Sequence, residues 1–171
     1  ASDSLKRPTF DTFELKRIVA DLLRESAEKF ILPRFQNLKP KDIATKSSNT
    51  DFVTIADQQS ESWLTPRLLE LQLGTVIGEE AASIKPSARE KIPCGYCWTV
   101  DPLDGTKNFV RGQTGFCSMV ALLWNGKPVE AWIWQPLTKI LFYASQEKGA
   151  FRISFDGEVR LALKRRPIIV D

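Results

Sequence analysis

Two aspartates three residues apart are the clearest chemical feature of this sequence. Asp101 and Asp104 belong to the run Asp-Pro-Leu-Asp-Gly-Thr, residues 101–106, which follows a short apolar stretch. The run Gly-Glu-Glu, residues 78–80, ends another apolar stretch upstream. Carboxylate oxygens at strand ends are suitable ligands for Mg²⁺, which binds one or two carboxylates together with substrate phosphate oxygens. The pattern therefore indicates metal-assisted hydrolysis of a phosphate ester.

The residues that complete this run are suited to binding an anion. Gly105 allows the backbone to approach a ligand closely, and a helix beginning at Thr106 would direct its free N–H groups at a phosphate. Thr106 is either the N-cap of that helix or a hydroxyl that takes part in the chemistry, and it could do both. Asp57 is either the N-cap of a second helix or the acceptor that activates Thr106, and the sequence leaves both interpretations open.

Each carboxylate alone would be an ordinary turn residue on the surface. Glu79, Asp101 and Asp104 converge, however, if the stretches 75–78 and 98–101 are neighbouring strands. Three carboxylates that close would repel one another unless cations neutralised them. Their joint occurrence favours a metal site. Lys46 lies in a polar loop and is expected to be solvated on composition alone.

The composition excludes several other kinds of active site. The 171 residues include no histidine, which excludes Ser-His and Cys-His pairs and His-ligated zinc. Cys94 and Cys97 have the C-x-x-C spacing, but with Cys117 they leave a zinc site one ligand short. They also precede a strand instead of opening a helix, so reduced thiols are expected. The net charge of +3 is too small and dispersed to indicate a nucleic-acid partner.

No apolar leader precedes the first helix, and the longest apolar stretch, roughly residues 116–124, is too short for a bilayer span of about 20 residues. We therefore expect a soluble, cytoplasmic protein with no membrane partner.

Two helices are expected before any long strand. A capping box at residues 11–14 and apolar residues at helical spacing over 15–31 predict a long amphipathic helix that ends or kinks at Pro33. A second helix is expected over about 57–72, bent at Pro66.

The rest of the chain has the pattern of strands. Asn125-Gly126 is the strongest short hairpin signal, residues 81–95 are polar and loop-like, and residues 167–171 look like the start of a further strand. This order predicts an α+β fold. Strands are expected at 52–55, 75–78, 98–101, 116–124, 128–134, 140–144, 150–153 and, more weakly, 161–163.

Three segments resemble motifs of the inositol monophosphatase family of Mg²⁺-dependent, lithium-sensitive phosphatases. Residues 101–109 match its D-P-[ILV]-D-G-T-x-N-F motif and residues 78–80 its G-E-E motif, while residues 46–57 are similar to its lysine-serine loop followed by D-x-V-T-x-x-D. The similarity extends roughly from residue 11 to 171. It implies two N-terminal helices packed on a mostly antiparallel sheet, the N-terminal half of the family's layered αβαβα fold, with the C-terminal domain absent from residues 1–171.

The resemblance also implies roles for the metal ligands. Glu79, Asp101 and the Leu103 carbonyl would bind a first Mg²⁺, Asp101 and Asp104 a second, and Glu79 would reach a third, weaker ion. The implied cofactor is Mg²⁺, with two or three ions in each complete site.

For the reaction itself, Gly105 and Thr106 would bind phosphate through backbone N–H groups. Glu79 and Thr106, the latter paired with Asp57, would orient and activate a metal-bound water. Lys46 would belong to a mobile loop that closes over the site. The implied partners are a small phosphorylated substrate, with inositol monophosphate as first choice, and a second subunit in a homodimer.

Family members also carry a C-terminal W-D-x-A-A-type motif, whose aspartate completes the second metal site. Asp156 and Asp171 are the later aspartates here, and both stand in other contexts. Inositol monophosphate, a 3′-phosphonucleotide, histidinol phosphate and fructose bisphosphate therefore remain open as substrates, as does a truncated, non-catalytic binding module. We expect these 171 residues alone to be a weak phosphatase or none.

Overall fold

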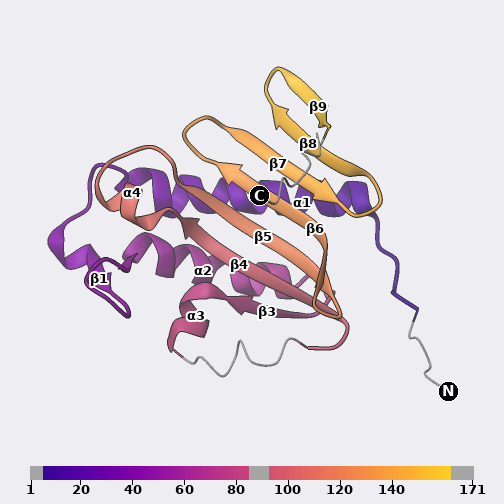
Figure 1. Cartoon of the computed structure of the whole chain (residues 1–171), viewed down its shortest axis with the longest axis horizontal. Helices are drawn as coiled ribbons and strands as arrows, with labels where there is room; N and C mark the ends of the chain where they lie inside the picture. Colours follow the sequence, from indigo (N-terminus) through magenta and orange to yellow (C-terminus); the bar gives the residue numbers. More distant parts are fainter. Residues whose placement is uncertain (1–5, 85–92, 163–171) are drawn as a thin grey trace, which may run out of the picture.

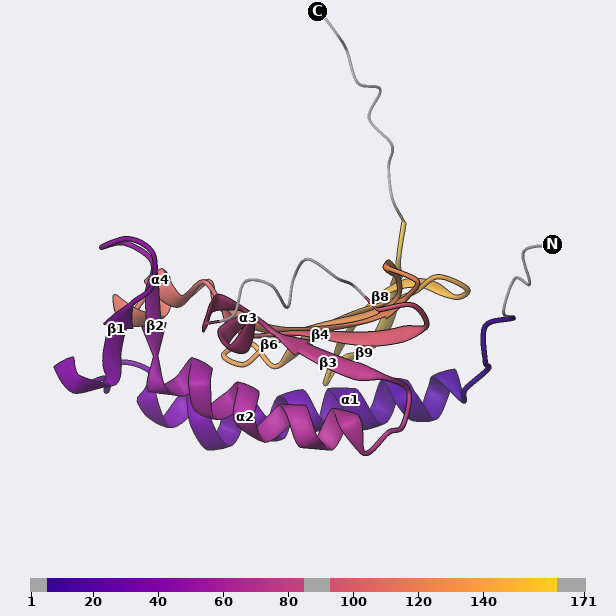
Figure 2. The same ribbon diagram turned by 90° about the horizontal axis from the view of Figure 1, so that it is seen from below.

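Two long helices lie against one face of a seven-stranded sheet (Figures 1 and 2). The computed structural model describes residues 6–84 and 93–162. The strand order is β3-β4-β5-β6-β7-β8-β9, in which β3 and β4 are parallel and every other pair is antiparallel. The helices are α1 (Thr12–Ser26) and α2 (Ile55–Leu69), and the strands are β3 (Thr75–Gly78), β4 (Tyr96–Asp104), β5 (Cys117–Trp124), β6 (Lys127–Gln135), β7 (Ile140–Ser145), β8 (Gly149–Ser154) and β9 (Gly157–Leu161). The predicted α+β fold with a mostly antiparallel sheet is confirmed.

Both helices begin at side-chain caps. The carboxylate of Asp11 accepts the backbone N–H of Glu14 at 3.0 Å and so caps α1. The helix continues into a π-helical turn (Ala27–Ile31) and a short 3₁₀ helix (Leu32–Arg34) that contains Pro33. The second helix begins two residues before the predicted position, because Thr54 is its N-cap. These caps set the residue at which each helix begins.

The main core lies between the helices and the sheet. Trp98 on β4 and Trp132 on β6 are fully buried, with their ring centroids 5.9 Å apart. The helices contribute Leu15, Val19, Leu23, Leu64 and Leu68 to the same cluster. In the described part of the chain no helix covers the middle of the opposite face (Figure 2). An open hollow of about 610 Å³ lies there, lined partly by Met119, Ala121, Ala131 and Ile133.

Short elements gather at one end of the sheet (Figure 1). A two-stranded hairpin, β1 (Ile43–Thr45) with β2 (Phe52–Thr54), follows a 3₁₀ turn (Pro40–Asp42). The helix α3 (Glu79–Ile84) follows β3, and α4 (Thr106–Val110) follows β4. These elements surround the ends of β3 and β4, where the sequence places its candidate site.

Several boundaries differ from the sequence-based expectations. Residues 81–84, expected in a loop, belong to α3, whose first turn is capped by a distant side chain described below. The weak strand expected at 161–163 shares only Leu161 with β9 (Gly157–Leu161), and residue 163, like the strand expected at 167–171, lies outside the described residues. The hairpin at Asn125-Gly126 is confirmed, with φ angles of 47° and 78° at its two turn residues. None of the helices in the described ranges has the length and apolar composition that a membrane span needs.

Candidate functional site

The ends of β3 and β4 bring the first two candidate ligands to the same edge. The strands are parallel, and Gly78 pairs with Val100. Glu79 and Asp101 each follow one member of this pair. The condition that the two strands be neighbours is therefore met, and these two carboxylates share one end of the sheet.

An irregularity in β4 positions the second aspartate. Asp101 pairs with Met119 on β5, and Asp104 pairs with Cys117, so the register shifts between the two aspartates. Residues three apart on a regular strand point to opposite faces, whereas a bulge redirects a side chain. The hydroxyl of Ser118 donates a hydrogen bond of 2.8 Å to the Pro102 carbonyl and stabilises this detour.

The Asp101 carboxylate lacks the partner that a buried polar group requires. Its Oδ1 is buried and has no hydrogen-bond partner among the described residues. Burial, followed by the nearby carboxyl groups of Glu79 and Asp104, raises the pKa of Asp101 well above its usual range. A cation at this position would offset both effects, because it would neutralise the repulsion and bind the free oxygen.

Gly105 makes the sharp turn from β4 into α4. It is the N-cap of α4 with φ at 82°, and a Cβ there would lie 2.5 Å from the Gly115 carbonyl oxygen. The turn therefore needs glycine for both its backbone angle and its space. Thr106 is the first residue of the helix, so the interpretation of Thr106 as N-cap is wrong by one position.

The Thr106 hydroxyl lies between two acceptors. Its Oγ1 is 3.0 Å from Oδ1 of Asp57 and 2.9 Å from the Leu103 carbonyl oxygen. A hydroxyl carries one proton, so only one of these hydrogen bonds is fully formed at a time. Thr106 can therefore donate to Asp57 while its lone pairs remain available to another donor.

Asp57 is not the N-cap of α2, because Thr54 holds that position; the contact of Asp57 with Thr106 is present, and that this contact activates Thr106 remains a prediction. Asp57 is the third residue of α2, and its Oδ2 accepts the backbone N–H of Thr54 at 2.8 Å and the Thr54 hydroxyl at 2.6 Å. The backbone contact, together with the Asp57 backbone N–H that the Thr54 side chain accepts, forms a capping box. Its other oxygen faces Thr106. Burial raises the pKa of Asp57 even though these hydrogen bonds oppose the shift.

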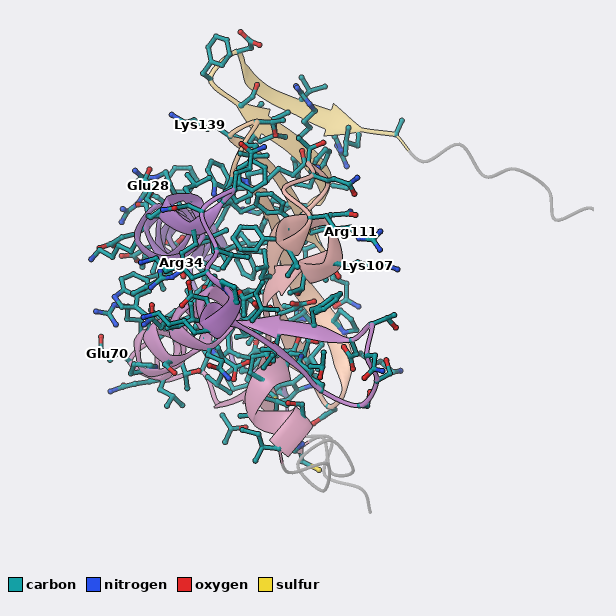
Figure 3. All side chains as sticks on the ribbon, turned by 90° about the vertical axis from the view of Figure 1, so that its left-hand side faces the viewer. Glu28, Arg34, Glu70, Lys107, Arg111 and Lys139 are labelled. Carbon is teal, nitrogen blue, oxygen red and sulfur yellow. The ribbon has the colours of Figure 1, made fainter. Side chains whose placement is uncertain are left out.

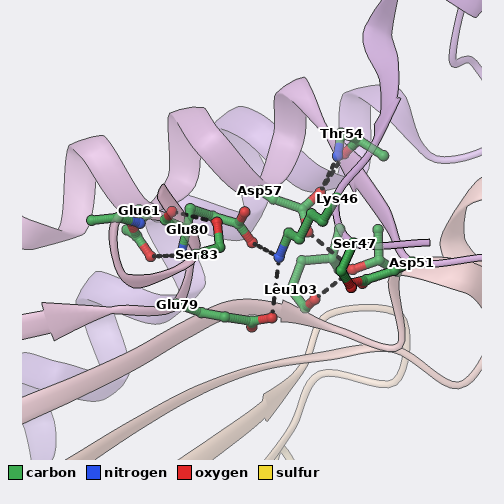
Figure 4. A network of polar contacts seen from close by, with 12 residues as sticks. Lys46, Ser47, Asp51, Thr54, Asp57, Glu61, Glu79, Glu80, Ser83 and Leu103 are labelled. Atoms are coloured by element: carbon green, nitrogen blue, oxygen red, sulfur yellow. Dashed lines mark hydrogen bonds and ion pairs between the residues drawn. The ribbon is translucent and has the colours of Figure 1, made fainter. Parts of the chain in front are cut away.

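Lys46 is not solvated, which corrects the expectation from composition. Its Nζ lies 3.2 Å from Oε1 of Glu79 and 3.0 Å from Oε1 of Glu80, and only 15% of the side chain is exposed (Figure 4). Burial alone would lower the pKa of Lys46, but contacts with Glu80 and Glu79 raise it overall. The two carboxylates attract this ammonium out of water. That its loop moves remains a prediction.

Two glutamates of the site were missed by sequence reasoning. Burial raises the pKa of Glu80 to about 7, against the opposing effect of Lys46. Glu61, on α2, is buried and accepts the backbone N–H groups of Glu80 at 2.8 Å and Ala81 at 2.9 Å. The position of Glu61 four residues after Asp57 was an available signal, because residues at that spacing share a helix face.

The carboxylates do not form a closed ligand shell. Over residues 6–84 and 93–162, no three His, Cys, Asp or Glu side chains are grouped so as to hold a metal ion. Lys46 contacts one oxygen of Glu79, and Asp104 is exposed. The structure thus brings Glu79 and Asp101 to one edge and places Asp104 beside them, with a donor set of oxygen atoms that suits Mg²⁺.

The cysteines do not add a nucleophile to this site. Cys94, Cys97 and Cys117 are free thiols. Cys117 lies nearest, with Sγ 3.9 Å from Oδ2 of Asp104. Burial and the carboxylates of Asp104 and Asp101 raise the pKa of Cys117 to about 11. This thiol is therefore neutral at physiological pH, which makes it a poor nucleophile.

Known proteins share these features along the chain. Inositol-1-monophosphatase of Bacillus subtilis is 29% identical over 157 residues, which are 91% of this chain and 55% of the relative. Nus factor SuhB of Xylella fastidiosa is 31% identical over 140 residues, which are 82% of this chain and 48% of the relative. The chain therefore spans about half the length of the curated relatives it matches.

The fold is shared as well. A solved IMPase/NADP phosphatase, complexed with NADP and Ca²⁺ at pH 7.0, superposes with a TM-score of 0.71 at 23% identity. The match covers 86% of this chain and 54% of that one. Residues 13–169 match the sequence model described as the Inositol monophosphatase family. This chain therefore belongs to the inositol monophosphatase family.

Proposed function

We propose that this chain carries the metal-binding half of a Mg²⁺-dependent phosphate monoester hydrolase, with inositol monophosphate as its first-choice substrate. The observation that carries the proposal is the buried, unpartnered oxygen of Asp101, which lies at the strand edge shared with Glu79. Family membership supports the proposal independently. The solved relative named above also contains a divalent cation, Ca²⁺.

The residues present fit the metal that the family implies. Glu79, Asp101 and the Leu103 carbonyl would hold one Mg²⁺, and Asp101 with Asp104 would hold a second. Bound there, the metal would polarise the phosphoryl oxygens and increase the acidity of a coordinated water. Lys46 would have to release Glu79, because its ammonium occupies one of the oxygens needed.

Thr106 and Asp57 would orient the attacking water and accept its proton. With its own proton donated to Asp57, the Thr106 hydroxyl can accept a hydrogen bond from water and orient it. Burial raises the pKa of Asp57, which makes this carboxylate a better proton acceptor than an exposed one. Asp57 is held by its hydrogen bonds with Thr54, and Thr106 is the first residue of α4. The two side chains are therefore positioned before the substrate binds.

The phosphate would bind at the turn into α4. Gly105 and Thr106 would direct backbone N–H groups toward it. Lys107 and Arg111 extend from the same region into solvent, on the side of the sheet away from α1 and α2 (Figure 3). Two exposed cations near the turn favour the approach of an anionic substrate.

A different class of function is favoured by one observation. The described carboxylates form no ready three-ligand group, and Lys46 already neutralises two of them. A chain of this kind could be a binding module that keeps the fold without turnover. One matched relative carries the name Nus factor SuhB, which is not an enzyme name.

Phosphate release separates the two functions. The chain should be assayed with inositol 1-phosphate, fructose 1,6-bisphosphate, histidinol phosphate and a 3′-phosphonucleotide, each with excess Mg²⁺ and with EDTA. We expect slow, Mg²⁺-dependent release that is abolished by Asp101→Asn. Release that is equal with Mg²⁺ and EDTA would contradict the catalytic proposal. Release from no substrate, by a chain that also binds no Mg²⁺, would leave the binding module.

Two finer properties follow from the family resemblance and belong to the same proposal. We expect lithium to inhibit the Mg²⁺-dependent release, and we expect the chain to form a homodimer in the cytoplasm. Light scattering of the purified chain tests the second expectation, since a monomeric mass at working concentration would contradict it.

A further inference from the structure

We propose that Glu61 is a positioning residue for the candidate metal site, because its carboxylate fixes the start of α3 and with it the place of Glu79 and Glu80. The role in metal binding rests on the proposed function, whereas the hydrogen bonds of Glu61 to α3 do not. The hydrogen bonds that the Glu61 carboxylate accepts come from the backbone of Glu80 and Ala81, so it would act through the segment that it holds.

The contact is a buried double hydrogen bond. Each oxygen of the Glu61 carboxylate accepts one backbone N–H, from Glu80 at 2.8 Å and from Ala81 at 2.9 Å (Figure 4). Glu61 is only 7% exposed. A charged acceptor shared by two N–H groups holds the backbone in both position and orientation. The first turn of α3 is therefore attached to α2 through Glu61.

Gly78 fits around this carboxylate. A Cβ at residue 78 would lie 2.2 to 2.6 Å from the carboxyl atoms of Glu61, far inside van der Waals contact. The backbone of the Gly-Glu-Glu run thus passes so close to Glu61 that only glycine leaves room for it. The requirement is steric, and it explains why the run begins with glycine in this structure.

One helix face holds both sides of the site. Asp57 and Glu61 lie four residues apart on α2 and therefore on the same face. Asp57 accepts the hydroxyl of Thr106 beside α4, whereas Glu61 accepts the amides of α3. Leu64 and Leu68 of the same helix are fully buried in the main core. The separation of the two sides is thereby set by a helix that the core immobilises.

A glutamine would not replace this glutamate. Its amide has the same shape, but only one of its two terminal atoms accepts hydrogen bonds, and its NH₂ group would face a second N–H donor. Glu61→Gln should therefore release one amide of α3 with little change in volume. Residues that orient metal ligands typically change metal affinity by about 10–100-fold when they are mutated.

The test is metal binding, with a matched control on the same helix. Mn²⁺ titration calorimetry on the 171-residue chain should give a dissociation constant at least about tenfold higher for Glu61→Gln than for the parent. Gly78→Ala, which pushes the carboxylate away, should weaken binding similarly. Glu70→Gln changes an exposed glutamate at the end of α2, labelled in Figure 3, and should bind as the parent does.

Amide exchange separates positioning from simple capping. In the parent, the amides of Glu80 and Ala81 should exchange much more slowly than free amides, and in Glu61→Gln at least one should exchange faster. Faster exchange with unchanged Mn²⁺ affinity would make Glu61 only a cap and overturn the proposal. If the amides of Glu80 and Ala81 exchanged as fast as free amides in the parent, the hydrogen bonds to Glu61 would be contradicted by the parent alone. If the parent bound no Mn²⁺ but kept both amides protected, the proposed function and the positioning role would both be refuted. Glu61 would then only cap the first turn of α3.

Discussion

Two regions of the sheet bury carboxylates in opposite ways. Glu130 on β6 is 5% exposed, and its oxygens accept hydrogen bonds from Tyr143 and, at 2.9 Å, from Ser145. Asp101 on β4 has a buried oxygen without any partner in the described ranges. Both carboxylates lie on strands of the same sheet, yet both oxygens of Glu130 have donors, whereas Oδ1 of Asp101 has none among the described residues.

The neighbours of each group explain the difference. Burial raises the pKa of Glu130, and the hydroxyls of Tyr143 and Ser145 oppose that shift. Burial also raises the pKa of Asp101, and there the carboxyls of Glu79 and Asp104 add to the shift. A buried carboxylate with satisfied oxygens contributes to the structure, whereas one crowded by other carboxylates would be stabilised by a bound cation. On this comparison we propose a structural role for Glu130 and a metal-binding role for Asp101.

The largest expected effect is on turnover. In a preparation with measurable phosphatase activity, Thr106→Ala should lower kcat about 100-fold while KM changes little, since the hydroxyl would act on water and not on substrate binding. Steady-state kinetics with inositol 1-phosphate measure this. A kcat within a few-fold of the parent would reduce Thr106 to the first residue of a helix.

The next effect is on the stability of the region around Glu130. Tyr143→Phe removes a donor from Glu130 and leaves a buried carboxylate oxygen unsatisfied, which should cost about 1–3 kcal/mol of unfolding free energy. Urea denaturation measures it, and the affinity for Mn²⁺ should stay unchanged. If Tyr143→Phe weakened metal binding as well, the two regions would not be independent.

A smaller effect is expected from removing the ammonium group of Lys46. Lys46→Met should bind Mn²⁺ several-fold more tightly, because Lys46 no longer competes for the oxygen of Glu79. Lys41→Met, at an exposed lysine before β1, serves as control. Weaker binding by Lys46→Met would mean that Lys46 supports the metal site instead of competing for it.

The smallest effect is a pH dependence of the metal-free chain. Burial raises the pKa of Glu80 to about 7, above its value of about 4.3 in an unfolded chain. The folded state then binds more protons, so the contribution to stability is full below pH 4 and is lost as the pH rises toward 7. The melting temperature should therefore be higher at pH 5 than at pH 8, and Glu80→Gln should reduce that difference. If the difference in melting temperature between pH 5 and pH 8 were unchanged in Glu80→Gln, other groups would be responsible for it.

Local patterns predicted the elements that depend on neighbouring residues. The Asn125-Gly126 turn, the cap at Asp11 and the apolar strands ending in carboxylates all follow from short-range rules. The pairing of β3 with β4 was only a condition for the carboxylates to converge, and the structure meets it. The Thr106–Asp57 contact was also anticipated as one of two possibilities.

What the sequence did not predict depends on contacts between distant residues. The helix α3 begins where Glu61 accepts its amides, about 20 residues away along the chain, so a local rule assigned residues 81–84 to a loop. Lys46 looked solvated because its loop is polar, but two carboxylates from α3 bind it. The register shift in β4 arises from pairing with β5, which no pattern within residues 101–104 reveals.

The most direct test of the central claim is a Mg²⁺ titration of three proteins by calorimetry: the parent chain, Asp101→Asn and Glu130→Gln. Both variants remove one negative charge from a buried carboxylate on the same sheet. We predict that the parent and Glu130→Gln bind Mg²⁺ with equal affinity and that Asp101→Asn loses at least about tenfold. Equal binding by Asp101→Asn and the parent would contradict the metal site.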